Sequence, residues 1–356
     1  MQKMLQRQLF ILLGVSTLLI VALSQTTLTL LSLAVIFVVW LWHWSVIWRS
    51  SAENRPNLTT PLNPTFGTAN WMSITRGFLN SVLFGFVIAV PTEANWVPAI
   101  LYTISALLDI FDGLVARLTK QQTMLGEKLD LEYDGAGVLI VVAVALRFGQ
   151  LPWWFWLIGL ARYLYLWGIA WRERRQLPIH PTPESHNRRV TAGLMMAYLT
   201  VILWPLVDTR SANVAAYVFG IPFLLGFLRD WLILIGWVGV DQASYRQGRV
   251  VYKQFTEVWL PQFGRITAFI LILTGLLTLD LTTVFAWFGL IGLVMIGLGI
   301  IARLGAIFLV VFAVLGNAAA VPSLILLVSA LVIIQYGLRC FSLWVPEERI
   351  FAGRLG

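Results

Sequence analysis

Carboxylate side chains are concentrated in one short stretch of this 356-residue chain. Only 17 residues are acidic, yet six of them lie within positions 109–134: Asp109, Asp112, Glu127, Asp130, Glu132 and Asp134. The flanking sequence is apolar, and an unpaired carboxylate at the centre of a membrane helix costs about 2.5–3.5 kcal/mol on insertion scales. Carboxylates concentrated in apolar sequence indicate a site that uses their negative charge.

Helical spacing sorts four of these carboxylates into two pairs. Asp109 and Asp112 are three residues apart and Asp130 and Asp134 are four apart, so each pair lies on one helix face. Two facing pairs without His or Cys form an all-oxygen site that suits Mg²⁺ or Mn²⁺. Two such ions would neutralise the carboxylates and supply the two-metal arrangement of phosphoryl chemistry. Asp109 precedes Arg117 by eight residues, about 12 Å of helix, so we expect the site just below the cytoplasmic surface.

Small and basic residues stand beside the carboxylates. Gly113 and Gly126 leave room for a ligand to approach the backbone closely. Arg117 follows one turn beyond Asp112, where a guanidinium can bind phosphate oxygens. The alternatives are close helix packing for glycines and anchoring at the membrane surface for the arginine. Spacing alone leaves these alternatives open.

The rest of the chain must supply membrane helices that hold this site. The sequence is 59% hydrophobic and 12% charged, with a mean hydropathy of +0.81, which excludes an ordinary soluble domain. We predict an all-α polytopic integral membrane protein. Since one span takes about 20 apolar residues, we expect about twelve transmembrane helices, at residues 8–24, 29–48, 78–92, 97–116, 133–149, 152–171, 190–207, 212–240, 265–279, 282–301, 304–316 and 319–338.

Cations indicate how these helices are oriented. The 25 basic residues exceed the acidic ones by eight, which could suggest nucleic acid, but membrane proteins concentrate such charge in cytoplasmic loops. With both termini inside, only Arg147 and Arg210 fall outside and Arg162 and Arg229 fall within spans. We therefore expect a cell-membrane protein with its site and both termini on the cytoplasmic side and no nucleic-acid partner.

The carboxylate stretch resembles the signature of a known family. The run Asp109-x2-Asp112-Gly113-x2-Ala116-Arg117-x8-Gly126-x3-Asp130-x3-Asp134 is similar to the complete motif of the CDP-alcohol phosphatidyltransferases. Upstream, Asn70-x2-Ser73-x2-Arg76 resembles the Asn-x2-Thr-x2-Arg element of that family, with Ser in place of Thr and Ala69 in place of the usual proline.

The resemblance implies a reaction and a role for each matching residue. A phosphatidyl group would pass from a CDP-linked lipid to an alcohol acceptor, with release of CMP. Asp109, Asp112 and Asp130 would hold two divalent ions, and Asp134 would be the general base while also lying close to the second metal. The CDP site would be lined by Gly113, Ala116, Arg117 and Gly126, with Asn70 and Ser73. A homodimer in contact with membrane lipids is also implied.

The acceptor site stays open at this stage. Family members that use phosphorylated acceptors often carry a Gly-Lys-x-Lys-Thr-like run where this chain has His186–Thr191. Arg188 and Arg189 in that run, together with Arg162, could bind an acceptor phosphate, or they could be membrane anchors. Glycerol phosphate, inositol phosphate, serine and other alcohols are all compatible with the sequence.

The expected organisation has three parts, and the function has an alternative. Residues 1–55 are expected to form a transmembrane hairpin, residues 66–240 a six-helix catalytic core, and residues 241–356 an amphipathic segment with about four further spans of unknown role. The alternative function is a transporter or ion pathway that uses the buried carboxylates. An intramembrane prenyltransferase, which also uses Asp pairs and Mg²⁺, fits the spacing less well.

Overall fold

The structure, a computed structural model, is helical throughout the residues that it describes, as predicted. An isolated β-bridge joins Ile300 and Trp344. The chain divides into two compact units, and each is described by itself. The first contains Met1–Gly168 and Met195–Thr209, and the second contains Ile169–Leu194 and Arg210–Gly356. The described residues are 2–25, 28–89, 95–183, 186–205, 207, 209–239, 247–248, 250–251, 254–275, 284–315, 320–338 and 342–344.

Every expected apolar segment overlaps a helix of the described residues. The helices are α1 (Gln2–Ala22), α2 (Leu30–Ser50), α3 (Gly67–Phe84), α4 (Val97–Leu118), α5 (Met124–Arg147), α6 (Trp156–Arg174), α7 (His186–Ile202), α8 (Thr209–Leu234), α10 (Leu260–Gly275), α11 (Val284–Leu298), α12 (Ala302–Leu315) and α13 (Ala320–Tyr336). Among the described residues, four helical stretches are long and apolar enough to cross a membrane, namely Lys3–Ala22, Leu30–Glu53, Val97–Leu118 and Ala215–Leu234. These candidate spans support a membrane protein, but the expected count of twelve spans is not confirmed.

A short connection between α4 and α5 sets the level of the aspartates. α4 starts with a proline in its first turn, a position that needs no backbone N–H, and α5 is capped by Thr123, whose side chain accepts from the Gly126 N–H at 3.0 Å. Asp112 stands six residues before the end of α4, and Asp130 stands six residues after the start of α5. Each therefore lies about 9 Å of helix from the connection, so one reversal of the chain brings both near the same level.

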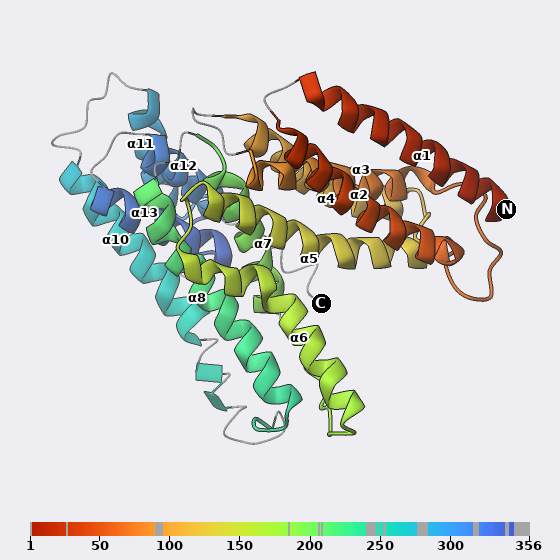
Figure 1. The fold of residues 1–356 in the computed structure, drawn as a ribbon. Coiled ribbons are helices and arrows are strands. Elements are labelled where there is room, and N and C mark those ends of the chain that lie inside the picture. Colours follow the sequence, from red (N-terminus) through yellow and green to blue (C-terminus); the bar gives the residue numbers. More distant parts are fainter. Residues whose placement is uncertain are drawn as a thin grey trace. The chain divides into compact units, whose positions relative to one another are not determined.

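The first unit is organised around α3, which packs against α2, α4 and α5 (Figure 1). Buried contacts join α2 to α3. The Trp40 ring meets the Phe78 ring edge-on, with centroids 5.2 Å apart, and His43 Nδ1 is hydrogen-bonded to Ser81 Oγ at 2.9 Å. The N-terminal hairpin thus packs directly on the helix between the two aspartate-bearing helices.

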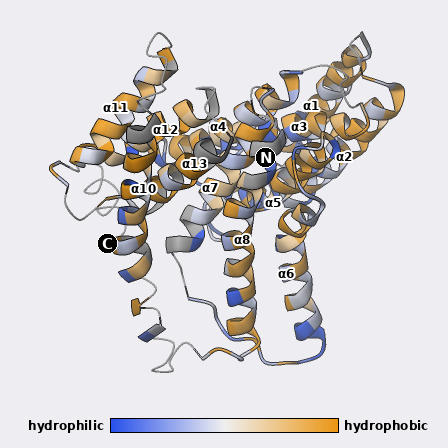
Figure 2. Ribbon diagram, turned by 90° about the vertical axis from the view of Figure 1, so that its left-hand side faces the viewer, coloured by the Kyte–Doolittle hydropathy of each residue, from blue (hydrophilic) through white to orange (hydrophobic). Residues whose placement is uncertain are grey.

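The two faces of α4 differ in chemical character. The inner face carries Tyr102, Ser105 and Asp112, which are buried, with Asp109 beside them. Apolar side chains are exposed on the other face, at the helical spacing expected of one stripe: Ile100, Ile104, Leu107, Phe111 and Leu114. A helix with apolar residues outside and carboxylates inside suits a lipid environment. Orange, apolar positions likewise cover much of the helices in Figure 2, whereas blue positions gather toward the C-terminal end of α6.

The second unit has its own apolar core. Buried residues from α10, α11, α12 and α13 form one cluster, which includes Ala268, Leu293, Leu309 and Ile333. A Cβ on Gly292 would lie 2.6 Å from the Gly305 carbonyl oxygen, so only glycine allows α11 and α12 to approach this closely. The expected three-part division of the chain stays a prediction.

Candidate active site

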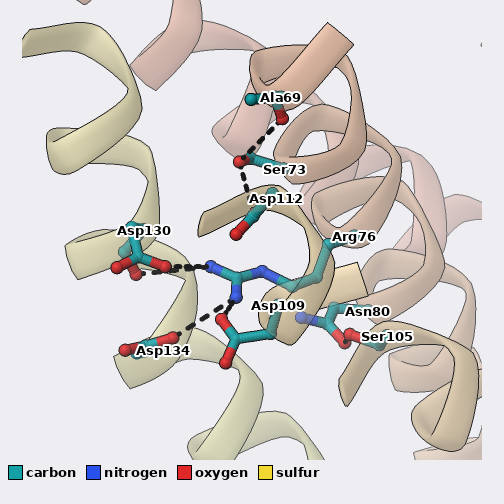
Figure 3. A network of polar contacts seen from close by, with 9 residues as sticks. All are labelled: Ala69, Ser73, Arg76, Asn80, Ser105, Asp109, Asp112, Asp130 and Asp134. Carbon is teal, nitrogen blue, oxygen red and sulfur yellow. Dashed lines mark hydrogen bonds and ion pairs between the residues drawn. The ribbon is translucent and has the colours of Figure 1, made fainter. Parts of the chain in front are cut away.

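Three carboxylates from two helices converge in the first unit. Asp109 and Asp112 of α4 and Asp130 of α5 each offer an oxygen atom, and these atoms all lie within 4.8 Å of one another. Figure 3 shows the side chains directed toward a shared space between the helices. The predicted opposition of carboxylates from two helices is therefore present for these three residues, which we call the aspartate cluster.

Arg76 of α3 lies among the carboxylates, a position that the residue pattern had not assigned to it. Its guanidinium forms ion pairs with Asp109, with Asp130 at 3.2 Å and with Asp134 at 3.5 Å (Figure 3). The side chain is only 4% exposed. The signal was present in the sequence, because Arg76 ends the Asn70-x2-Ser73-x2-Arg76 element and a buried cation needs anionic partners.

Ser73 holds the most buried member of the aspartate cluster. Its Oγ donates to Asp112 Oδ2 at 2.7 Å, and Asp112 as a residue is only 6% exposed. Ser73 and Arg76 are three residues apart and lie on the same face of α3. This helix therefore binds carboxylates of both neighbouring helices, because Ser73 and Arg76 both contact aspartates of α4 and Arg76 also contacts aspartates of α5.

Asp134 does not belong to the group of three converging carboxylates. It lies one turn after Asp130 on α5, and its contact with the site is the ion pair to Arg76. Its side chain is 37% exposed, so a ligand can reach it. Access from outside is a condition that a proton acceptor needs, and the ion pair with Arg76 orients the carboxylate.

Asn70 and Gly126 meet at the start of α3 and α5. Asn70 Nδ2 donates to Thr123 Oγ1 at 3.1 Å, and Thr123 caps α5. A Cβ on Gly126 would lie 2.8 Å from Asn70 Oδ1. Because this is closer than real Cβ contacts allow, glycine is required at position 126 for Asn70 to keep its position.

Arg117 folds back along the end of α4. A Cβ on Gly113 would lie 3.3 Å from Arg117 Nη1, so the guanidinium covers the glycine that follows Asp112. Ala116 is half-buried on the same helix, and Arg117 is exposed. Gly113 and Arg117 are thus close together, and phosphate binding by this pair stays a prediction.

Arg162 of α6 packs against α5 next to Asp134. A Cβ on Gly135 would lie 2.5 Å from Arg162 Cδ, so the arginine stem crosses the helix at this glycine. The absence of a side chain at Gly135 is what lets the stem lie there. Among the arginines considered for the acceptor, Arg162 is the one that this unit contains.

Arg188 lies in the second unit, where it has an acidic partner. Its Nη1 is 3.1 Å from Asp230 Oδ2, and Arg229 Nη2 is 2.7 Å from Asp230 Oδ1. Asp230 is buried, and both arginine side chains are partly exposed. Two guanidinium groups against one carboxylate leave a net positive charge. The side chain of Arg189 lies outside the described residues.

The donor set of the aspartate cluster fits a hard divalent cation. Asp109, Asp112 and Asp130 supply carboxylate oxygens only, which are the donors that Mg²⁺ and Mn²⁺ prefer. The side chains of Asp109 and Asp130 are 26% and 54% exposed, so an ion can enter. Arg76 occupies the buried side of the cluster. Its positive charge neutralises part of the negative charge of the carboxylates, as a bound metal ion also would.

Comparison with known proteins identifies the same region of the chain. Residues 66–242 match the family CDP-alcohol phosphatidyltransferase. Over 145 residues the chain is 31% identical to proteins of Mycobacterium tuberculosis and Mycobacterium bovis, each named "Putative cardiolipin synthase", and the alignment covers 40% of this chain and 66% of each relative. The chain thus spans slightly less than two thirds of these relatives.

A shorter alignment links the chain to a protein from another organism. Over 61 residues the chain is 38% identical to a CDP-diacylglycerol–glycerol-3-phosphate 3-phosphatidyltransferase of Cereibacter sphaeroides, which is 17% of this chain and 28% of that protein. No solved structure matches the chain.

Proposed function

Because the chain belongs to the CDP-alcohol phosphatidyltransferase family through residues 66–242, we propose that it transfers a phosphatidyl group from a CDP-linked lipid of the CDP-diacylglycerol type to an alcohol acceptor. CMP is the leaving group. The names of the relatives, a cardiolipin synthase and a phosphatidyltransferase, support a place in phospholipid synthesis.

The observation that carries this proposal is the convergence of Asp109, Asp112 and Asp130 within 4.8 Å. These three residues, with Asp134 beside them, would hold two divalent ions, either Mg²⁺ or Mn²⁺. When bound, such ions neutralise the pyrophosphate and stabilise charge that develops on the transferred phosphoryl group.

The chain's own residues bind the nucleotide and remove a proton. Gly113, Ala116, Arg117 and Gly126, with Asn70 and Ser73, line the CDP side. The guanidinium of Arg117 meets phosphate oxygens. Gly113 leaves room for this guanidinium, and Gly126 leaves room for the Asn70 side chain.

Asp134 accepts the proton of the acceptor hydroxyl while the hydroxyl oxygen attacks phosphorus. A new bond forms between the acceptor oxygen and phosphorus, and the bond from phosphorus to the CMP oxygen breaks. The ion pair of Asp134 with Arg76 supports this role, because it orients the carboxylate.

We propose that the acceptor is an alcohol that carries a phosphate group. Arg162 of the first unit, beside Asp134, would bind that phosphate. Arg188 and Arg189 are a separate candidate for anion binding within the second unit, where the net positive charge around Asp230 supports an anion. Glycerol 3-phosphate, which the name of the Cereibacter relative contains, is the first acceptor to test.

The proposal also covers the location and the oligomeric state of the enzyme. The distribution of cations supports a cell-membrane protein with its active site and both termini on the cytoplasmic side, and the family resemblance supports a homodimer. Mass measurement or crosslinking in detergent tests the oligomeric state, and an active monomer would contradict it.

The experiment that tests the function is release of CMP from CDP-diacylglycerol by the purified protein with Mg²⁺ or Mn²⁺. The acceptors are glycerol 3-phosphate, phosphatidylglycerol, inositol phosphate and serine, each with and without chelator. Asp112→Asn should abolish release, whereas Glu127→Gln, an exposed acid of α5 outside the aspartate cluster, should not.

An opposite result would favour the transporter alternative. That function predicts ion or solute flux in proteoliposomes without any CMP. The gathering of three carboxylates at one level, rather than along a path, supports the enzyme.

A further inference from the structure

The segment between the N-terminal hairpin and α3 contacts the N-terminal parts of α3 and α5, which carry Asn70 and Gly126 of the proposed CDP site. Residues Glu53, Asn54 and Arg55, which we call the clasp, lie outside the range that matches the family. Glu53 Oε1 forms an ion pair with Lys128 Nζ of α5 at 3.0 Å. The Arg55 carbonyl accepts a 2.9 Å hydrogen bond from the N–H of Met124, the first residue of α5.

Asn54, the middle residue of the clasp, is fully buried, at 0% exposure. Its Nδ2 donates to the Thr65 carbonyl at 2.8 Å and lies 3.4 Å from the Asn63 carbonyl. The Asn54 carbonyl in turn accepts from the Asn63 N–H at 2.9 Å. These bonds fix the orientation of the Asn54 amide, because its nitrogen must face the two carbonyls.

With its nitrogen so directed, Asn54 presents Oδ1 to α3. Asn70 Nδ2 donates to this oxygen at 3.1 Å and also to Thr123 Oγ1 at 3.1 Å. Both hydrogens of the Asn70 amide are thereby used, and its Oδ1 faces the position of Gly126. The orientation of Asn70 therefore depends on an acceptor that comes from outside the matched domain.

We propose that Asn54 is a positioning residue for nucleotide binding, which acts by holding the Asn70 side chain and, through Thr123, the first turn of α5. The inference rests on the proposed function, in that Asn70 and Gly126 are taken to line the CDP site. Asn54 itself contacts no substrate. The N-terminal segment is thus a working part of the active site and not only a membrane anchor.

The test is steady-state kinetics of Asn54→Ala with CDP-diacylglycerol and the acceptor varied separately. Loss of a buried hydrogen-bond partner should raise KM for CDP-diacylglycerol about 5- to 20-fold. We expect kcat and the acceptor KM to stay within about twofold, because Asn54 is remote from Asp134 along the chain of contacts.

The double variant separates positioning from general stabilisation. In an Asn70→Ala background, Asn54→Ala should cause no further rise in KM for CDP-diacylglycerol, because the side chain that it positions is already absent. Independent, multiplying effects of the two substitutions would overturn the proposal. So would an unchanged KM, or an equal fall of kcat with every substrate.

Two further variants keep the test decisive. Asn57→Ala is the matched control, since Asn57 lies three residues away, is exposed, and bonds only within its own turn to Thr59 and Thr60 among the described contacts. Its kinetics should equal those of the wild type. If Asn54→Ala does not yield a monodisperse protein, Asn54→Ser is measured instead, because a hydroxyl can still bond a nearby carbonyl but is too short to reach Asn70.

Failure of the proposed function gives a different result from failure of this inference. A wild-type protein that releases no CMP from CDP-diacylglycerol contradicts the function. In that case the affinity for CDP can still be measured by calorimetry in detergent, for the wild type and for the Asn54→Ala variant. Equal CDP affinity of the two proteins would overturn the positioning role.

Discussion

Ser73 Oγ donates a 2.7 Å hydrogen bond to Asp112 Oδ2 and so joins α3 to α4 at the buried edge of the aspartate cluster. A hydrogen bond to a carboxylate is stronger than one between neutral groups, and it fixes the direction of the free oxygen. Asp112 therefore keeps one oxygen for Ser73 and can offer the other to a ligand.

The first prediction concerns this hydroxyl. Ser73→Ala leaves a buried carboxylate without its donor, so we expect the protein to lose about 1–3 kcal/mol of stability and to need more Mg²⁺ for half-maximal activity. Thermal unfolding followed by tryptophan fluorescence and a Mg²⁺ titration measure the two effects. Ser73→Thr keeps the hydroxyl and should restore both values, and a Thr variant as impaired as Ala would show that the hydroxyl is not what matters.

The second prediction concerns Arg76. Its guanidinium pairs with Asp109, Asp130 and Asp134, so Arg76→Gln leaves these carboxylates facing one another without a cation. The metal-free variant should unfold at a lower temperature than the metal-free wild type. Added Mg²⁺ should then raise the melting temperature of the variant more than that of the wild type. Equal stabilisation of both proteins by Mg²⁺ would show that Arg76 and the ion do not neutralise the same carboxylates.

The third prediction concerns the proton acceptor. Asp134→Asn cannot take a proton from the acceptor hydroxyl, so kcat should fall about 10²- to 10⁴-fold while KM for CDP-diacylglycerol changes little. Glu132→Gln is the matched control, because two residues along a helix turn the side chain to the opposite side of α5. An Asn variant with unchanged turnover would remove Asp134 from the mechanism as its base.

The fourth prediction concerns Gly126. A methyl group there would lie 2.8 Å from Asn70 Oδ1 and 3.3 Å from Thr123 Oγ1, so Gly126→Ala should displace Asn70 and raise KM for CDP-diacylglycerol. We expect a loss of about 1–3 kcal/mol from overpacking, in spite of the better helix propensity of alanine. On α1, Gly14→Ala meets nothing within 4 Å and should be neutral or slightly stabilising. Similar behaviour of the two alanine variants would contradict the close contact.

Much of the fold was predictable because helix formation and apolar periodicity are local properties. All twelve apolar segments overlap helices of the described residues. The same pattern does not settle how many helices cross the membrane, since within the described part of the chain four stretches are both long and apolar enough to span alone. The expected three-part division of the chain, with a core at 66–240, stays a prediction.

Residue spacing predicts which carboxylates share a helix face, and the short turn between α4 and α5 keeps Asp112 and Asp130 at a similar level. The residues that lie between and beside these carboxylates are visible only in the packed structure. Arg76 joins Asp130 from 54 residues away along the chain, and Asn54 reaches Asn70 from outside the matched domain. Such contacts depend on how separate elements pack against α3, and neither helical period nor motif spacing contains that information.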